Sequence, residues 1–328
     1  MKVPAPSLVD VRGLFGSLTT AEADHLIPRI TKDPVRMAQI ESEVRSKPTS
    51  HRLVRGDARR LPEYGIEPES VHLVVTSPPY WTLKEYRHGA DQLGDVSDYE
   101  QFLDAIDKVW RACFDALVPG GRLVVVVGDV LLSRRQHGRH QVVPLHADIA
   151  VRCRRLGFDV LAPIIWYKIG NASFEAEGNG GGFLGKPFEP NAVVKNDIEY
   201  ILMLRKPGGY RSPSPQKRVL SVIPSDAHRR WFKQVWDDVR GESTRDHPAP
   251  FPTELAERLI RMFSFYADTV LDPFGGTGTT AVAASRWGRD SISVEVEPEY
   301  LAHAERRLKD ELSSLEAKHS LKVVRSRL

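Results

Sequence analysis

Six residues in the first third of the chain combine hydrogen-bond acceptors with aromatic rings. Residues 76–81 read Thr-Ser-Pro-Pro-Tyr-Trp, and the pair Pro78 and Pro79 removes backbone donors while leaving carbonyl oxygens free. The Ser77 hydroxyl and the Pro78 carbonyl could accept the two hydrogens of an exocyclic amino group. Tyr80 could stack on a base swung out of a duplex. A rigid proline turn with both aromatic rings packed in the core explains these six residues equally well.

A second segment, residues 271–280, reads Leu-Asp-Pro-Phe-Gly-Gly-Thr-Gly-Thr-Thr and resembles a nucleotide-binding turn. Its small residues let the backbone approach a ligand, and Asp272 can bind a cation or a hydroxyl. Glu295 follows Gly278 by seventeen residues, at the position where nucleotide-binding folds place an acid on ribose hydroxyls. No Lys follows the final glycine, which argues against a phosphate-binding P-loop. The segment predicts an adenosine-containing cofactor and by itself does not exclude NAD.

The hydrophobic pattern predicts the strands and helices that would position these two segments. Apolar runs predict strands over residues 71–76, 123–127, 160–167, 198–204, 269–271 and 291–296. Helical spacing predicts helices over residues 34–45, 98–117, 142–156, 252–265, 279–287 and 299–318. The alternation predicts an α/β fold with a doubly wound, mostly parallel sheet, and ligands should bind outside the carboxyl ends of its strands.

Composition limits the class of protein. The chain has 328 residues, 41% of them hydrophobic, which suits one large domain with a smaller insertion. No apolar run reaches membrane-spanning length and the N-terminus lacks a signal-peptide pattern, so a cytoplasmic protein is expected. The cysteines Cys113 and Cys153 have no metal-binding spacing, so we expect core residues rather than a disulfide or a metal site.

Positive charge is concentrated in two segments. Residues 205–245 hold ten Lys and Arg against four Asp and Glu, and residues 134–139 form a second basic stretch. Each is an ordinary solvated face unless the chemistry demands a polyanionic partner.

The two chemical segments together resemble the signature motifs of the amino-group DNA methyltransferases. In that family the Ser-Pro-Pro-Tyr motif is catalytic and the Gly-rich motif binds S-adenosylmethionine. Their order here resembles the permuted β-group, and the resemblance covers about residues 52–310. It implies a Rossmann-like class I methyltransferase fold, S-adenosylmethionine as cofactor and double-stranded DNA as substrate.

The resemblance also assigns residues. The implied catalytic residues are Ser77, Pro78, Pro79 and Tyr80, with no metal. The implied cofactor-binding residues are Asp57, Phe251, Asp272, Phe274, Gly275, Gly276, Thr277, Gly278 and Glu295. Among these, Asp57 should reach the adenine, Glu295 the ribose and Phe251 the methionine end.

Serine at position 77 resembles the cytosine-N4 subgroup, with adenine N6 as the main alternative target. The implied division is an N-terminal extension (1–50), a catalytic half (51–170), a target-recognition region (171–246) and a cofactor-binding half (247–328). A restriction endonuclease in the same system is an expected partner. The oligomeric state is left open, a homodimer being one option.

The implied mechanism is base flipping followed by direct attack of the amino nitrogen on the methyl group. Cytosine-C5 chemistry fits poorly because it needs a cysteine nucleophile, typically after proline, and neither cysteine follows one. RNA or protein-amide methylation remains open. An NAD-dependent oxidoreductase would use the Gly-rich turn equally well but would leave residues 76–81 without a role.

Overall fold

The computed structural model describes residues 18–81, 93, 96–132, 137–139, 141–168, 197–241 and 251–325. The strands of its main sheet are β1 (Ser50–Arg55), β2 (Val71–Thr76), β3 (Leu117–Val127), β6 (Asp159–Tyr167), β7 (Ile198–Arg205), β8 (Val235–Trp236), β9 (Thr269–Asp272), β10 (Asp290–Glu295) and β11 (Ser320–Arg325). A separate small hairpin pairs β4 (Val130–Leu132) with β5 (Gln141–Val143).

The helices are α1 (Thr20–Ile30), α2 (Pro34–Arg45), the 3-10 helix η2 (Ala58–Tyr64), α3 (Tyr99–Ala116), α5 (Leu145–Leu156), α7 (Pro215–Val219), α8 (Ser225–Trp231), α9 (Thr253–Phe263), α10 (Thr279–Arg286) and α11 (Pro298–Ser313). Within the described ranges, no helix combines the length and apolar character needed to cross a membrane.

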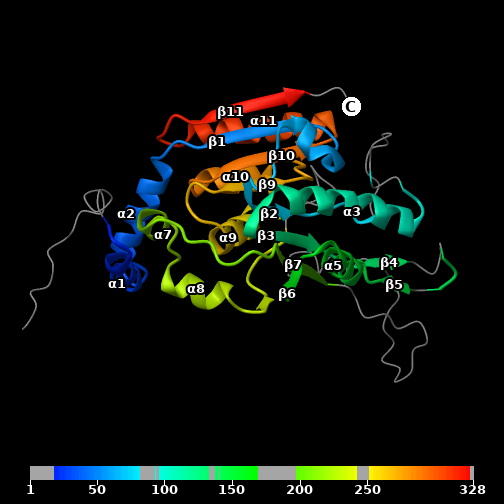
Figure 1. Ribbon diagram of the computed structural model, residues 1–328, viewed down its shortest axis with the longest axis horizontal. Coiled ribbons are helices and arrows are strands. Elements are labelled where there is room, and N and C mark those ends of the chain that lie inside the picture. Colours follow the sequence, from blue (N-terminus) through cyan, green and yellow to red (C-terminus); the bar gives the residue numbers. More distant parts are fainter. Residues whose placement is uncertain are drawn as a thin grey trace, which may run out of the picture.

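The nine-stranded sheet has the order β11-β1-β10-β9-β2-β3-β7-β6-β8 (Figure 1). Strand β7 runs antiparallel to both of its neighbours, β3 and β6, and every other neighbouring pair is parallel. The predicted α/β architecture with a mostly parallel sheet is therefore confirmed. Because β1, β10, β9 and β2 are parallel neighbours, their carboxyl ends lie in a row along one edge.

Alternate residues of the central strands bury opposite faces of the sheet. In β3, Leu123, Val125 and Val127 join the core beneath α3 and α5, whereas Val124 and Val126 join the core beneath α8, α9 and α10. Such continuous apolar runs are typical of strands covered on both faces. The six predicted strands all occur; five match their expected ends within one residue, whereas β3 begins at Leu117 rather than at residue 123.

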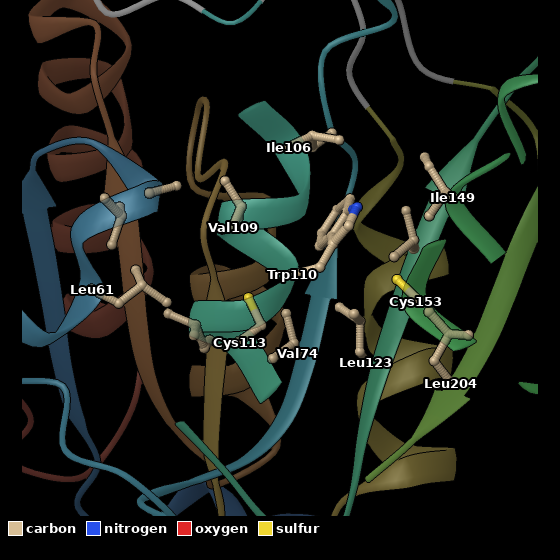
Figure 2. Close-up of a cluster of buried hydrophobic side chains, with 14 of the residues drawn as sticks. Leu61, Val74, Ile106, Val109, Trp110, Cys113, Leu123, Ile149, Cys153 and Leu204 are labelled. Atoms are coloured by element: carbon tan, nitrogen blue, oxygen red, sulfur yellow. The ribbon is translucent and has the colours of Figure 1, made fainter. Parts of the chain in front are cut away.

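Figure 2 shows the core between the sheet and α3, where Trp110 and Cys113 project toward Val74 and Leu123. Cys153 of α5 lies in the same cluster, and both cysteines are free and fully buried. Their predicted role as core residues is confirmed. Burial also raises the pKa of both thiols, which keeps them protonated.

The N-terminal region contains more structure than its sequence suggested. The helix predicted over residues 34–45 is present as α2, but the expectation that it is the sole helix before residue 50 is wrong. Helix α1 precedes it, begun by a capping box in which Thr19 and Glu22 exchange hydrogen bonds. Its buried Ile30 packs in one cluster with Ile40 of α2 and Val219 of α7, so tertiary packing stabilises a helix that contains Pro28.

Two of the other features that the sequence did not predict are strand β11 and the early start of β3. Strand β11 follows α11 and pairs in parallel with β1 at the edge of the sheet. Strand β3 begins at Leu117 and continues through Pro119, Gly120 and Gly121, ahead of the strand predicted over residues 123–127. Gly120 adopts a φ of +75°, and a Cβ there would lie 2.5 Å from the Gly209 carbonyl oxygen. Glycine thus lets two chain segments approach closely at this position.

Candidate active site

Three residues predicted to bind a cofactor and the predicted catalytic residue Ser77 converge at the carboxyl ends of four neighbouring strands. Asp57 follows β1, Glu295 ends β10, Asp272 ends β9 and Ser77 follows β2. The Gly56 amide donates a hydrogen bond of 3.0 Å to the Glu295 carbonyl oxygen, which fixes the first two ends against each other. In this class of sheet, ligands bind at such an edge.

Asp272 connects the two chemical segments. Its side chain is 1% exposed, and its carboxylate accepts hydrogen bonds from the hydroxyls of Thr76 and Thr280, both 2.7 Å, and from the Phe274 amide at 3.0 Å. Burial raises its pKa to about 6, although the three hydrogen bonds oppose that shift. Both oxygens are engaged within the protein, so the structure gives Asp272 a positioning role. Its predicted contact with a ligand stays a prediction.

The Gly-rich turn is fixed by glycine backbone conformations. Gly276 and Gly278 have φ values of +50° and +83°, and a Cβ on Gly278 would lie 2.9 Å from the Cβ of Ala304. Gly278 is the N-cap of α10. A Cβ on Gly275 would lie 2.9 Å from the Ser293 side chain, so this turn packs directly against β10.

Glu295 lies beside this turn. Its carboxylate accepts hydrogen bonds from the Gly276 amide at 2.7 Å and from the Glu297 amide at 2.9 Å. Burial raises its pKa to about 7, and the nearby Asp272 carboxylate contributes to the increase. The glycine backbone of this turn and the acid that follows Gly278 by seventeen residues are thus in direct contact, through the Gly276 amide.

The other predicted cofactor residues occupy three different environments. Asp57 is buried and paired with Arg59 at 2.6 Å. Thr277 is also buried, and its hydroxyl and carbonyl oxygens each accept a hydrogen bond of 3.1 Å from Arg307. Phe274 is half-buried at the edge of the core, whereas Phe251 is buried in the cluster beneath α9. Contact between these residues and a cofactor remains a prediction.

The Ser-Pro-Pro-Tyr segment continues directly from β2. Tyr80 is 4% exposed, and its hydroxyl donates a hydrogen bond of 3.0 Å to Glu199 and lies 3.3 Å from the Ser77 hydroxyl. Trp81 has a φ of +45°, which is strained for a bulky residue, and its indole donates to the Val96 carbonyl oxygen. In this structure the Tyr80 ring is packed in the core. Its stacking role stays a prediction.

Glu199 and Lys168 are functional candidates that sequence reasoning missed. Glu199 lies at the amino end of β7, and Lys168 lies just beyond the carboxyl end of β6. Because these strands are antiparallel, both residues lie at the edge of the sheet that carries the candidate active site. The Glu199 carboxylate is buried and receives both the Tyr80 hydroxyl and the Lys168 ammonium. No spacing in the sequence joins the three residues, so the contact depends on sheet topology alone.

The basic stretch is largely engaged within the protein. Ion pairs join Arg205, Lys206, Arg211, Arg218 and Arg230 to nearby carboxylates. Four cations of the stretch have no ion pair among the described residues: Lys217, Arg229, Lys233 and Arg240. Residues 171–196 and 242–246 of the expected target-recognition region lie outside the described residues, as do residues 134–136 of the second basic stretch. Strands β7 and β8 of that region belong to the main sheet.

Comparison with known proteins identifies the family. The family model for DNA methylase, covering N6 and N4 methyltransferases, matches residues 71–306, so the chain belongs to this family. Type II methyltransferase M.MjaI from Methanocaldococcus jannaschii is 36% identical over 280 residues, covering 76% of this chain and 88% of that protein. Type II methyltransferase M.MthZI from Methanothermobacter thermautotrophicus is 32% identical over 286 residues, with coverages of 80% and 78%.

A solved structure gives the same answer. TTHA0409 from Thermus thermophilus, in complex with S-adenosyl-L-methionine, is 52% identical and superposes with a TM-score of 0.69. The similarity covers 85% of this chain and 99% of that one.

Replacing Asp272 by Asn should change how stability depends on pH. Between pH 4 and 6 the unfolded wild type loses the Asp272 proton while the folded state keeps it, because the folded pKa is about 6 instead of 3.8. Wild-type stability should therefore fall as pH rises through this window, by up to ~3 kcal/mol from this group. Asp272→Asn preserves the shape, and its amide can still bond both threonine hydroxyls.

Urea unfolding of both proteins at pH 4.5 and pH 7 measures the difference. We expect the variant to gain stability relative to wild type as pH rises. Parallel pH profiles would show that burial does not govern this carboxyl group.

Proposed function

We propose that this protein transfers a methyl group from S-adenosylmethionine to the N4 amino group of cytosine in double-stranded DNA, at a specific sequence and after base flipping. The observation that carries the proposal is the hydrogen bond between Thr76 and Asp272. It holds the start of the Ser-Pro-Pro-Tyr segment against the start of the Gly-rich turn. A methyl donor in that turn and an amino group at that segment would therefore be adjacent.

The residues at the edge of the sheet fit an adenosine-bearing cofactor. Gly275, Gly276 and Gly278 leave three positions of the turn without a side chain, and Glu295 offers a carboxylate to ribose hydroxyls beside them. Asp57 follows β1, the strand next to β10, where it could reach an adenine. The complex of TTHA0409 with S-adenosyl-L-methionine supports the same ligand for this chain. When bound, this cofactor supplies an electrophilic methyl group.

The chemical step then requires positioning rather than a covalent enzyme intermediate. The Ser77 hydroxyl and the Pro78 carbonyl oxygen accept hydrogen bonds from the amino group and orient its nitrogen lone pair. Holding the nitrogen, the methyl carbon and the sulfur in line supplies much of the rate enhancement. The Tyr80 hydroxyl donates to Glu199 and accepts from the Ser77 hydroxyl, and these hydrogen bonds hold the segment together before substrate binds.

Cytosine N4 is preferred over adenine N6 because serine occupies position 77, the residue typical of the cytosine-N4 subgroup. The family includes both kinds of enzyme, which makes adenine N6 the alternative target. The names of M.MjaI and M.MthZI as type II methyltransferases support a restriction endonuclease partner.

The DNA backbone would be bound by cations that the protein does not neutralise itself. Lys217, Arg229, Lys233 and Arg240 are the candidates, because the remaining described cations of the basic stretch already pair with carboxylates.

Analysis of nucleosides from methylated DNA tests the target base. The purified protein is incubated with unmethylated genomic DNA and S-adenosylmethionine, and the digested nucleosides are separated by retention and mass. We expect N4-methyldeoxycytidine. N6-methyldeoxyadenosine as the sole product would refute the cytosine assignment and retain the amino-methyltransferase, whereas no methylated nucleoside with active cofactor binding would refute both.

Cofactor affinity should depend on pH through Glu295. The ionised carboxylate accepts hydrogen bonds from ribose hydroxyls, and its pKa in the free protein is raised to about 7. Affinity should therefore fall as pH falls, and S-adenosylmethionine should bind about tenfold more weakly at pH 6 than at pH 8. Calorimetric titrations at both pH values measure the ratio. Glu295→Gln serves as the control and should bind weakly with little pH dependence; an equally steep profile in that variant would exclude Glu295 as the titrating group.

Two substitutions at Tyr80 separate ring burial from ring stacking. Tyr80→Phe keeps the ring and loses the bond to Glu199, so stability should fall by ~0.5–1.5 kcal/mol with little loss of turnover. Tyr80→Ala should cost ~3–5 kcal/mol of stability because the side chain is buried. Loss of stacking should add a ten- to hundredfold loss of turnover, corresponding to ~1–3 kcal/mol.

Melting curves, cofactor titrations and tritium-methyl transfer on these variants provide the three measurements. Turnover is compared at a temperature where both variants are folded and bind cofactor. A Tyr80→Ala protein with wild-type turnover under those conditions would contradict the stacking role.

A further inference from the structure

A cavity lies at the opposite edge of the sheet from the candidate active site. It has a volume of about 460 Å³ and is bordered by the amino end of β3, the carboxyl end of β7 and parts of α1, α7, α8 and α9. Five arginines line it: Arg122, Arg205, Arg211, Arg218 and Arg261. Among the described residues, no Asp or Glu contributes to this lining.

Two of these arginines face each other across neighbouring strands. Arg122 of β3 is directly opposite Arg205 of β7, which in turn is directly opposite Asp159 of β6. Arg205 donates hydrogen bonds of 2.7 and 3.1 Å to Asp159, so the acid among these three cross-strand neighbours is already engaged by Arg205. Like charges at directly opposed positions destabilise a sheet unless another group compensates.

Arg122 lacks such compensation in the described part of the chain. It has no ion pair or hydrogen bond there, and its guanidinium lies over the Phe263 ring, 4.9 Å from the ring centroid. Burial and the charge of Arg205 lower its pKa. A partly buried cation in this position is unfavourable without a counter-ion.

Three of the other arginines are held in place by residues that do not line the cavity. Arg211 makes a two-pronged contact of 2.6 Å and 2.6 Å with buried Asp268, and Arg218 pairs with Asp24. Arg261 stacks on Trp287 with 3.5 Å between its guanidinium carbon and the ring centroid. Side chains fixed in this way lose little conformational freedom when a ligand binds.

We propose that this cavity binds the phosphate group of a small molecule, with Arg122 as its principal ligand. Guanidinium groups match phosphate oxygens in charge and planar geometry. The volume is in the range of small-molecule sites, and a mononucleotide would fit. At the rim, Tyr210 is 89% exposed and lies against Arg205, so its ring is available to an attached base or sugar. Free phosphate has the same anionic chemistry without those additional contacts.

Calorimetry on the full chain tests the site while the cofactor site is saturated with S-adenosylhomocysteine. The probes are uridine 5′-monophosphate, inorganic phosphate and uridine, all at one ionic strength. We expect one binding site per chain for both phosphate-bearing probes and no binding of uridine. Tighter binding of the nucleotide than of phosphate identifies a nucleotide site, and equal affinity identifies a site for the free anion.

Arg122→Met should weaken binding of either phosphate probe at least tenfold, the loss expected for ~1.5–3 kcal/mol of charge-assisted hydrogen bonding. Because it removes a like-charge pair, its melting temperature without ligand should equal or exceed that of wild type. Arg122→Lys keeps the charge but not the planar fork and should lose less affinity. Arg230→Met, an exposed arginine of α8 outside the cavity lining, is the matched control and should bind as wild type does.

Three results would overturn the proposal. One is a phosphate affinity that is unchanged in Arg122→Met, and another is a heat signal that sodium chloride reproduces at equal ionic strength. The third is displacement of uridine monophosphate by a short DNA duplex, which would assign these arginines to DNA backbone binding. Methyl transfer activity enters none of these measurements, so they stand apart from the proposed function.

Discussion

The hydrogen bonds of the buried Asp272 carboxylate hold together the edge of the sheet that carries the candidate active site. It receives hydroxyl groups from the end of β2 and from the first turn of α10, and an amide from the turn between β9 and α10. A single side chain thus positions the Ser-Pro-Pro-Tyr segment, the Gly-rich turn and the helix that follows it. Such a network is fully satisfied, and a buried polar network with every group paired specifies one arrangement. The Gly-rich turn and the Ser-Pro-Pro-Tyr segment cannot shift independently while these hydrogen bonds are intact.

Sheet topology explains why residues distant in the sequence share this edge. Asp57 and Glu295 are far apart in the chain, yet they follow neighbouring parallel strands, β1 and β10. The antiparallel strand β7 brings its amino end to the same edge, which is why Glu199 can receive the Tyr80 hydroxyl. Strand direction, rather than order along the chain, decides which residues meet.

The sequence predicted the features that short-range patterns encode. Apolar runs located the six predicted strands, and the paired motifs identified the family that the comparisons confirm. It did not reveal α1, because Pro28 and a polar composition hide a helix whose stability comes from packing against α2 and α7. It also assigned Asp272 to the ligand by its place at a strand end. The Thr76 hydroxyl that engages one of its oxygens can be recognised only once β2 and β9 are known to be neighbours.

The acids of the active edge raise an electrostatic problem for a protein that acts on DNA, since carboxylates repel a polyanion. Two of these acids pair with a cation, and burial disfavours the charged form of the other two. Asp57 pairs with Arg59 and Glu199 with Lys168, whereas burial raises the pKa of Asp272 to about 6 and that of Glu295 to about 7. Part of the charge on Glu295 is therefore absent near neutral pH. The burial of these acids beside the Gly-rich turn thus also lowers the negative potential at this edge of the sheet.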